Sequence, residues 1–321
     1  MSPRFTGPYA RDLREFIAFK RTRGCLYGPR VQRRLLSFDR FVAGHSSGRR
    51  PALKRLIGKW LSRSGQRHRK TVMADLSTIR QFCLFLRRRI PNCHVPDLRD
   101  GPTWKQVRRF RPYIFSIDEV LRLLDHAGTL RPGFRALTFQ TMIAVYYCTG
   151  IRAGEGTRLR LRDLDLKART LLVRKSKNKT RWVPFHADLA RRLRRYLDER
   201  MQLTPNSPNS PLFARPNGLA YENDRFSNEF RDLLRKLGLK GPIGQRGGPR
   251  LTDLRHTYAT HTLLGWHQDG VDLQSWLPIL SAYMGHDHLL GTEHYLSGTP
   301  ELLDLASKRY WDRFNRRELR L

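Results

Sequence analysis

The sequence is short of acidic residues and of cysteines, and these two shortages exclude several classes of protein. Its 321 residues contain 28 Asp plus Glu against 62 Lys plus Arg, and four cysteines without C-x-x-C spacing. Scattered cysteines argue against a disulfide framework and a zinc ribbon, and they favour a reduced, cytoplasmic protein. The N-terminus lacks the apolar core of a signal peptide, and no stretch reaches the roughly 18 uncharged apolar residues of a membrane span. We therefore expect no membrane association.

The excess of basic residues points to a polyanionic partner. The formal net charge is +34, and arginine pairs recur along the whole chain instead of in one tail. Basic residues interleaved with aromatic ones over the full length are typical of a protein that wraps its partner. Arginine dominates over lysine, which suits bidentate contacts to phosphate. A coding bias toward arginine explains part of the charge, but we expect a DNA-associated protein.

Residues 1–92 have the pattern of short amphipathic helices. Apolar residues recur at positions i, i+3 and i+4, with basic residues on the opposite faces. The longest run, from Val72 to Leu86, ends in three arginines. The pattern predicts a small helical domain able to clamp DNA, although helical bundles in general share it. The three earlier runs contain Leu13, Phe16 and Ile17, then Val31, Leu35, Phe38 and Val42, then Leu53, Leu56, Ile57, Trp60 and Leu61.

A change of composition marks a second domain. Residues 93–112 are rich in proline, glycine and charge, which predicts a basic interdomain linker. Ser116 with Glu119 three residues later is a capping box, so a helix is expected to begin there. Residues 169–185 read as a β-hairpin with a basic tip. Further helices are expected over 187–201, with the arginines outward, and over 224–237. The expected fold class is mainly α with a small β-hairpin or sheet.

Three short segments carry the chemistry. Residues 149–155 read TGIRAGE, residues 254–260 read LRHTYAT, and residues 284–286 read MGH, with Tyr295 nine positions after His286. In this order and spacing the two arginines, the histidine and the tyrosine resemble the boxes of the tyrosine recombinase (phage integrase) family. The resemblance implies a helical core-binding domain over 1–92, which closes around the duplex, and a mixed α/β catalytic domain over 113–300. It also implies a C-terminal helix over 301–321, either exchanged between subunits or folded back on its own core.

The resemblance assigns a role to each residue of the boxes. Arg152 and Arg255 would hold the non-bridging oxygens of the scissile phosphate as negative charge builds there. Glu155 would buttress Arg152, and His286 would hydrogen-bond the phosphate. Tyr295 would attack the phosphorus and give a 3′-phosphotyrosine with a free 5′-hydroxyl. Because the covalent link conserves the phosphodiester energy, no cofactor is implied, neither ATP nor a metal.

The general acid is less clearly placed. In the family, a lysine on the hairpin protonates the leaving 5′-oxygen. The tip offers Lys175, Lys177 and Lys179, and we favour Lys177. An ungapped comparison places Ser176 at the family position, and any of these lysines could equally contact phosphate.

Thr252 departs from the family pattern. The position three residues before Arg255 is a histidine in the family's second box. Threonine can donate a hydrogen bond but cannot titrate near neutral pH. Either Thr252 suffices, or Arg250 substitutes for the histidine, or the activity is weak.

Several alternatives remain open. His286, His288 and His294 lie close in sequence, but nearby cysteines or carboxylates do not complete a metal site. The favoured function is site-specific recombination for mobile-element integration or transposition, by a homotetramer on two duplexes of double-stranded DNA. Residues 270–286 and 295–303 resemble a transposon-associated branch encoded in sets of adjacent genes, which would make sister recombinases partners in a hetero-assembly. The rivals are an inactive DNA-binding paralogue and a monomeric type IB topoisomerase.

Overall fold

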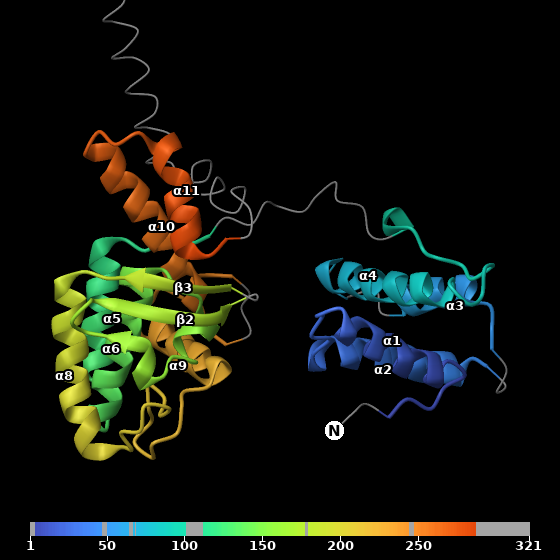
Figure 1. Cartoon of the computed structure of the whole chain (residues 1–321), viewed down its shortest axis with the longest axis horizontal. Coiled ribbons are helices and arrows are strands. Elements are labelled where there is room, and N and C mark those ends of the chain that lie inside the picture. Colours follow the sequence, from blue (N-terminus) through green and yellow to red (C-terminus); the bar gives the residue numbers. More distant parts are fainter. Residues whose placement is uncertain are drawn as a thin grey trace, which may run out of the picture. The chain divides into compact units, whose positions relative to one another are not determined.

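The chain divides into two units, residues 1–109 and 110–321 (Figure 1). No helix among the residues that the structure describes is long and apolar enough to cross a membrane. The computed structural model describes residues 4–46, 50–63, 67, 69–100, 112–176, 179–243 and 247–286.

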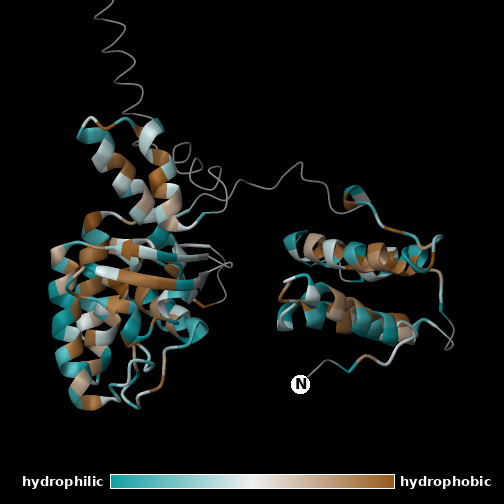
Figure 2. Ribbon diagram, in the orientation of Figure 1, coloured by the Kyte–Doolittle hydropathy of each residue, from teal (hydrophilic) through white to brown (hydrophobic). Residues whose placement is uncertain are grey.

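The described part of the first unit is helical. The four amphipathic runs fold as predicted, and their apolar stripes meet in one core around Phe16, Phe38, Trp60 and Phe82. Each helix carries both hydrophobic and hydrophilic segments (Figure 2), as a helix with one buried face must. The helices are α1 (Ala10–Thr22), α2 (Pro29–Gly44), α3 (Leu53–Ser62) and α4 (Arg69–Leu86), followed by the 3-10 turn η1 (Leu98–Asp100).

A buried carboxylate of this helical unit faces several arginines. The Asp75 side chain on α4 is only 4% exposed and faces Arg34, Arg63 and Arg67. Arg34 approaches it at 3.2 Å, and the Arg63 guanidinium also lies 4.1 Å from the centre of the Trp60 ring. A buried charge needs partners of this kind, because an unpaired carboxylate is costly in an apolar interior.

The second unit is mainly α with a small antiparallel sheet, as predicted. Its first helix begins at the expected capping box, where the Ser116 hydroxyl accepts from the Glu119 amide at 3.1 Å. The elements are α5 (Ile117–Gly128), α6 (Gly133–Thr149), α7 (Ala153–Gly156), η3 (Leu161–Asp163), β1 (Leu164–Asp165), β2 (Thr170–Ser176), β3 (Lys179–Pro184), α8 (Ala187–Leu203), α9 (Asn223–Lys236), α10 (Leu251–Gln268) and α11 (Leu273–Met284).

The predicted hairpin forms β2 and β3, and β1 adds a short edge that the sequence did not predict. Val173 lies opposite Arg181, and Leu172 lies opposite Trp182. Because paired residues share a face, Arg181 lies on the same side as the buried Val173. Arg174, the next residue along β2, belongs to the other face.

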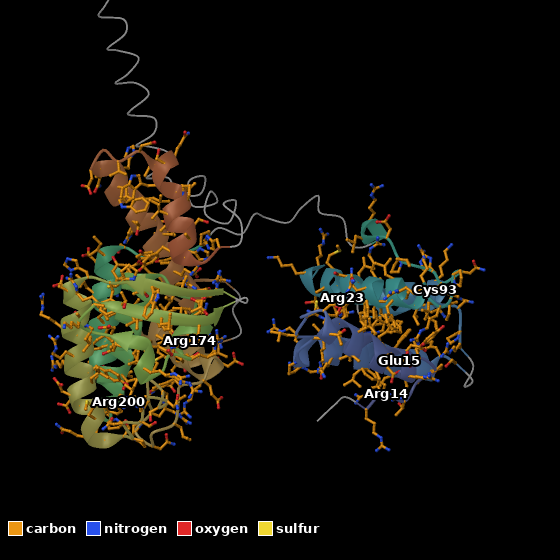
Figure 3. The ribbon with its side chains drawn as sticks, in the orientation of Figure 1. Arg14, Glu15, Arg23, Cys93, Arg174 and Arg200 are labelled. Atoms are coloured by element: carbon orange, nitrogen blue, oxygen red, sulfur yellow. The ribbon has the colours of Figure 1, made fainter. Side chains whose placement is uncertain are left out.

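The arginines of α8 do not all face outward, contrary to the sequence prediction. Arg200 is completely buried (Figure 3). Its guanidinium donates to the carbonyls of Leu212, at 3.1 Å, and Pro211, at 2.8 Å, and to the Asn206 side chain. These bonds fasten the irregular segment after α8 to the helix, and they satisfy a buried cation without a carboxylate.

Helices α10 and α11 connect the main core to a separate apolar cluster. The start of α10 packs Leu254 into the main core, whereas its later residue Leu263 packs with Leu277 and Leu280 of α11. In Figure 1 this pair extends beyond the ends of α5, α6 and α8. The α10–α11 pair therefore begins at the core and ends in a cluster of its own, with Trp276 exposed.

Candidate active site

A glycine turn at the end of α6 brings the first arginine into place. Gly150 has a φ of 58° in the left-handed region, and its amide donates to Tyr146 O at 3.1 Å. A Cβ at Gly150 would lie 2.3 Å from Cδ1 of Tyr258, so only glycine fits between α6 and α10. The chain then passes directly to Arg152 at the start of α7.

Arg152 joins Glu155 to the turn that follows α11. Its Nη1 donates to Oε1 of Glu155 at 2.8 Å, and its Nη2 donates to the Gly285 carbonyl at 2.6 Å. The Glu155 side chain is 1% exposed, and its Oε2 accepts from the Arg152 amide at 2.8 Å. The carboxylate therefore fixes both the backbone and the side chain of Arg152.

Arg255 meets the other two segments from α10. It is 8% exposed, and its Nη1 donates to the Gly150 carbonyl at 2.6 Å. Its Nη2 donates to the Met284 carbonyl and lies 2.8 Å from Nε2 of His286. Since a guanidinium only donates hydrogen bonds, Nε2 of His286 accepts this one. Arg152, Glu155, Arg255 and His286 are thus brought together from three distant parts of the sequence.

Arg181 is a member of this group that sequence reasoning missed. Its Nη2 and Nη1 approach the two oxygens of Glu155 at 2.9 Å and 3.2 Å, and its Nε donates to Tyr283 O at 2.8 Å. The signal was present in the alternation of β3: Val183 is buried, so the residue two positions earlier points inward as well. A charge at an inward strand position needs a buried partner, and here that partner is Glu155.

Two tyrosines pack against each other beside the group. Tyr258 and Tyr283 stack with ring centres 5.6 Å apart, and burial raises the pKa of both hydroxyls. The Tyr283 hydroxyl also donates to the Pro184 carbonyl at 2.9 Å. A phenol with a raised pKa holds its proton more firmly, so these side chains act as packing groups.

Thr252 lies in the first turn of α10, three residues before Arg255, and it is exposed. The suggested substitute, Arg250, has its guanidinium 3.0 Å from the buried Asp253 carboxylate. The Arg250 amide donates to the same side chain at 2.8 Å. Arg250 is therefore tied to the start of its own helix.

Other predicted site residues fall outside what is described. Tyr295, Lys177, His288 and His294 lie outside the described residues, as does the predicted C-terminal helix over 301–321. Lys175 belongs to β2, but its side chain is not described. Across residues 4–286, in the parts the structure covers, no three His, Cys, Asp or Glu side chains group together to hold a metal ion.

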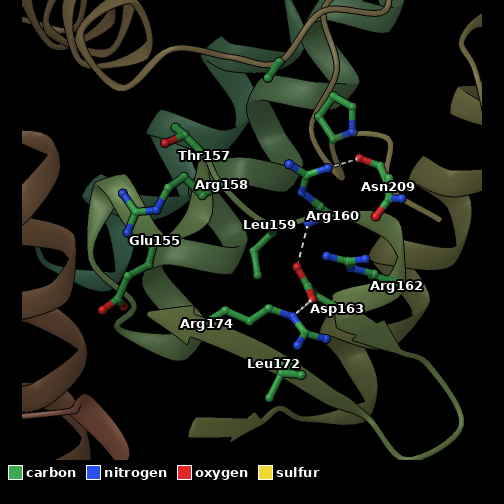
Figure 4. A pocket seen from close by; sticks show the side chains of 12 residues that line it. Glu155, Thr157, Arg158, Leu159, Arg160, Arg162, Asp163, Leu172, Arg174 and Asn209 are labelled. Atoms are coloured by element: carbon green, nitrogen blue, oxygen red, sulfur yellow. Dashed lines mark hydrogen bonds and ion pairs between the residues drawn. The ribbon is translucent and has the colours of Figure 1, made fainter. Parts of the chain in front are cut away.

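Cavities lie on two sides of the group. One of about 540 Å³ is lined by Thr180, Arg181, Ser281, Gly285 and His286, among others. The second, of about 480 Å³, lies beyond Glu155 and is edged by arginines, with Arg174 bound to Asp163 at 2.6 Å (Figure 4). The first cavity is the one that opens onto the Arg181 and His286 side chains.

Comparison with known proteins gives the family. Residues 114–301 match the phage integrase family. The putative integrase/recombinase y4rB of Sinorhizobium fredii is 31% identical over 308 residues, which cover 94% of this chain and 96% of that protein.

Solved structures share the fold. The Tn1549 transposon integrase, in complex with a circular intermediate DNA, matches with a TM-score of 0.66 at 16% identity, over 93% of this chain and 99% of the other. A lambda integrase tetramer bound to a Holliday junction matches with a TM-score of 0.59 at 16% identity, over 89% and 76%. The chain belongs to the phage integrase family, the tyrosine recombinases, and is an enzyme that breaks and rejoins DNA through a tyrosine intermediate.

Proposed function

We propose that this protein is a site-specific recombinase that forms a 3′-phosphotyrosine through Tyr295 and acts in the integration or transposition of a mobile element. The observation that supports the proposal is that Arg152 and Arg255 both bind the turn that carries His286. Arg152 donates to the Gly285 carbonyl, and Arg255 donates to the Met284 carbonyl and to His286. The similarity to y4rB and to a transposon integrase fold supports the mobile-element role.

The two arginines suit a phosphate in its transition state. Negative charge on the non-bridging oxygens grows as the tyrosine oxygen approaches phosphorus, and fixed guanidinium groups stabilise that charge without reorganising. Arg152 and Arg255 are held by backbone carbonyls and by Glu155 before any DNA arrives. His286, whose Nε2 accepts from Arg255, would donate to the phosphate through its other ring nitrogen.

Cleavage then requires that one proton leaves the attacking tyrosine and that another reaches the leaving 5′-oxygen. The Tyr295 hydroxyl gives its proton to solvent and its oxygen bonds to phosphorus, while the bond from phosphorus to the 5′-oxygen breaks. Lys177, or Lys175, on the hairpin would give a proton to that leaving oxygen. The reverse sequence, with a new 5′-hydroxyl as nucleophile, rejoins the strand.

We assign double-stranded DNA as substrate and a tetramer on two duplexes as the active assembly. The net charge of +34 suits a backbone-binding protein. The lambda integrase of shared fold is a tetramer on a Holliday junction. Sister recombinases from adjacent genes would be the partners in a mixed assembly.

The test is covalent trapping on a nicked suicide substrate made from the ends of the element. Wild type should give an adduct that survives a denaturing gel, and Tyr295→Phe should bind the same DNA without forming one. Adducts with Tyr295→Phe would place the nucleophile elsewhere and overturn the assignment. Relaxation of any supercoiled plasmid by a monomer would instead indicate topoisomerase activity.

The second candidate is a DNA-binding paralogue without activity. The exposed Thr252, in place of the family histidine, favours it. Intact binding with no adduct, in the presence of sister proteins, would select this candidate.

A further inference from the structure

Arg181 connects the hairpin to the two elements that carry the first and third boxes. Its side chain, 11% exposed, reaches from β3 to Glu155 on α7 with two nitrogens and to the Tyr283 carbonyl on α11 with the third. Every nitrogen of the guanidinium therefore faces a fixed acceptor. A flat, forked group is the side chain able to make this contact, because a lysine has a single charged nitrogen.

The turn before His286 is shaped around this guanidinium. Gly285 has a φ of 67°, and a Cβ there would lie 2.8 Å from Nη1 of Arg181. The same glycine accepts the hydrogen bond from Arg152 at its carbonyl. The turn is thus held on one side by Arg181 and on the other by Arg152, while Arg255 binds the preceding carbonyl of Met284.

Glu155 makes the two arginines interdependent. Its Oε1 accepts from both Arg152, at 2.8 Å, and Arg181, at 3.2 Å. Loss of Arg181 would remove a guanidinium that contacts both oxygens of a carboxylate that is only 1% exposed. The carboxylate and Arg152 would then be free to shift toward the space that Arg181 had filled.

We propose that Arg181 is a positioning residue that fixes Arg152 and the His286 turn in the geometry that holds the scissile phosphate. The proposal rests on the proposed function, because it assigns Arg181 an effect on that cleavage step. Arg181 acts through its contacts with Glu155 and the Tyr283 carbonyl. It affects the position of the charged groups around the phosphate and not the protonation of the leaving oxygen.

Arg174 supplies a matched control. It lies on the neighbouring strand, on the opposite face, and its Nε donates to the buried Asp163 carboxylate at 2.6 Å. Arg174→Met therefore also removes a hairpin arginine from a buried acid. The difference in cleavage rate between Arg181→Met and Arg174→Met therefore reports the contacts of Arg181 with Glu155 and Tyr283.

The experiment measures single-turnover cleavage of the suicide substrate with protein in excess. Arg181→Met should lower the first-order rate constant by about 10²–10³-fold, the effect of losing a preorganised group around the transition state. Arg181→Lys should recover little, and Arg174→Met should cleave near the wild-type rate once DNA is saturated. Equal rates for Arg181→Met and wild type would overturn the proposal.

A substrate with sulfur in place of the leaving 5′-oxygen separates the two ways of slowing cleavage. A thiolate leaves without protonation, so a defect in the general acid is rescued and a defect in phosphate positioning is not. Arg181→Met should stay slow on this substrate, while whichever of Lys177→Ala and Lys175→Ala removes the general acid recovers. Recovery of Arg181→Met would assign the arginine to the leaving-group lysine and refute the proposal.

Hydrogen exchange without DNA gives a readout that does not depend on cleavage. In Arg181→Met, amides of residues 152–156 and 283–286 should exchange at least about tenfold faster, because their anchoring contacts are lost. Arg174→Met should leave both segments protected. Unchanged protection in Arg181→Met would refute the inference, whereas a wild type that shows this protection yet forms no adduct would refute only the proposed function.

Discussion

Each unit of the molecule has a buried carboxylate that faces more than one arginine, and the two clusters differ in the further contacts that those arginines make. Asp75 in the helical unit meets Arg34, Arg63 and Arg67, and one of them packs on the Trp60 ring. Glu155 in the second unit meets Arg152 and Arg181.

The partners of Asp75 make their further contacts within the helical unit, as Arg63 does with the Trp60 carbonyl, whereas those of Glu155 continue to the carbonyls that precede His286. Arg152 goes on to the Gly285 carbonyl, and Arg181 goes on to that of Tyr283. The same buried ion pairing can therefore stabilise a fold in one place and, in the function that we propose, orient the turn before His286 in another. What separates the two functions is the second contact of each arginine.

The largest expected effect comes from neutralising Glu155. In Glu155→Gln, one side-chain amide must face two guanidinium groups. Its NH₂ is a hydrogen-bond donor, so it repels the guanidinium donors instead of accepting hydrogen bonds from them. We expect a fall in the single-turnover cleavage rate of about 10²–10³-fold, as for loss of a preorganised group around the transition state. The measurement is adduct formation with protein in excess over the suicide substrate.

Asp75→Asn is the matched change in the other unit. Both substitutions should cost about 3–5 kcal/mol of folding free energy in urea unfolding, since each breaks a buried ion pair. Asp75→Asn should nevertheless cleave at close to the wild-type rate under conditions where the protein is folded. A cleavage defect in Asp75→Asn as large as that of Glu155→Gln would abolish the distinction between the two clusters.

A pair of glycines tests how tightly the turn between α6 and Arg152 is packed. Gly150 and Gly270 have φ values of 58° and 76°, but a Cβ meets Tyr258 only at Gly150, and space is open around Gly270. Alanine is strained at both positions, so their difference reports the close contact alone. We expect Gly150→Ala to lose about 1–3 kcal/mol more than Gly270→Ala in urea unfolding, the usual cost of overpacking. Equal losses would show that the turn relaxes around the added methyl.

The difference between local contacts and contacts set by tertiary packing explains which features the sequence could predict. The helices of the first unit and the Ser116 capping box follow from local periodicity and local hydrogen bonds, and the structure has them. Arg152 and Arg255 could be selected by motif spacing, and they do lie together with Glu155 and His286. In these cases the informative residues are neighbours in sequence or members of a known box.

The features that the sequence did not predict share a physical cause. Arg181 and Arg200 look like other surface arginines, because their acceptors are set by tertiary packing; the Tyr283 carbonyl lies 102 residues from Arg181. The strand β1 has two residues, too few to show a period. A charged residue at an inward strand or helix position is the signal that would have found both arginines.

The smallest effect is expected at Thr252, which precedes Arg255 by one helical turn and is exposed on α10. Its hydroxyl can give the phosphate one hydrogen bond, worth about 1 kcal/mol, so Thr252→Ala should slow single-turnover cleavage by about fivefold. Thr252→His would add a group with an ordinary pKa of about 6.5. The ratio of its cleavage rate to that of wild type should then change with pH between about 5.5 and 7.5, since His286 is common to both proteins. Wild-type rates that already change across this range would mean that another group titrates in the site, and an unaltered rate in Thr252→Ala would remove Thr252 from the phosphate contacts.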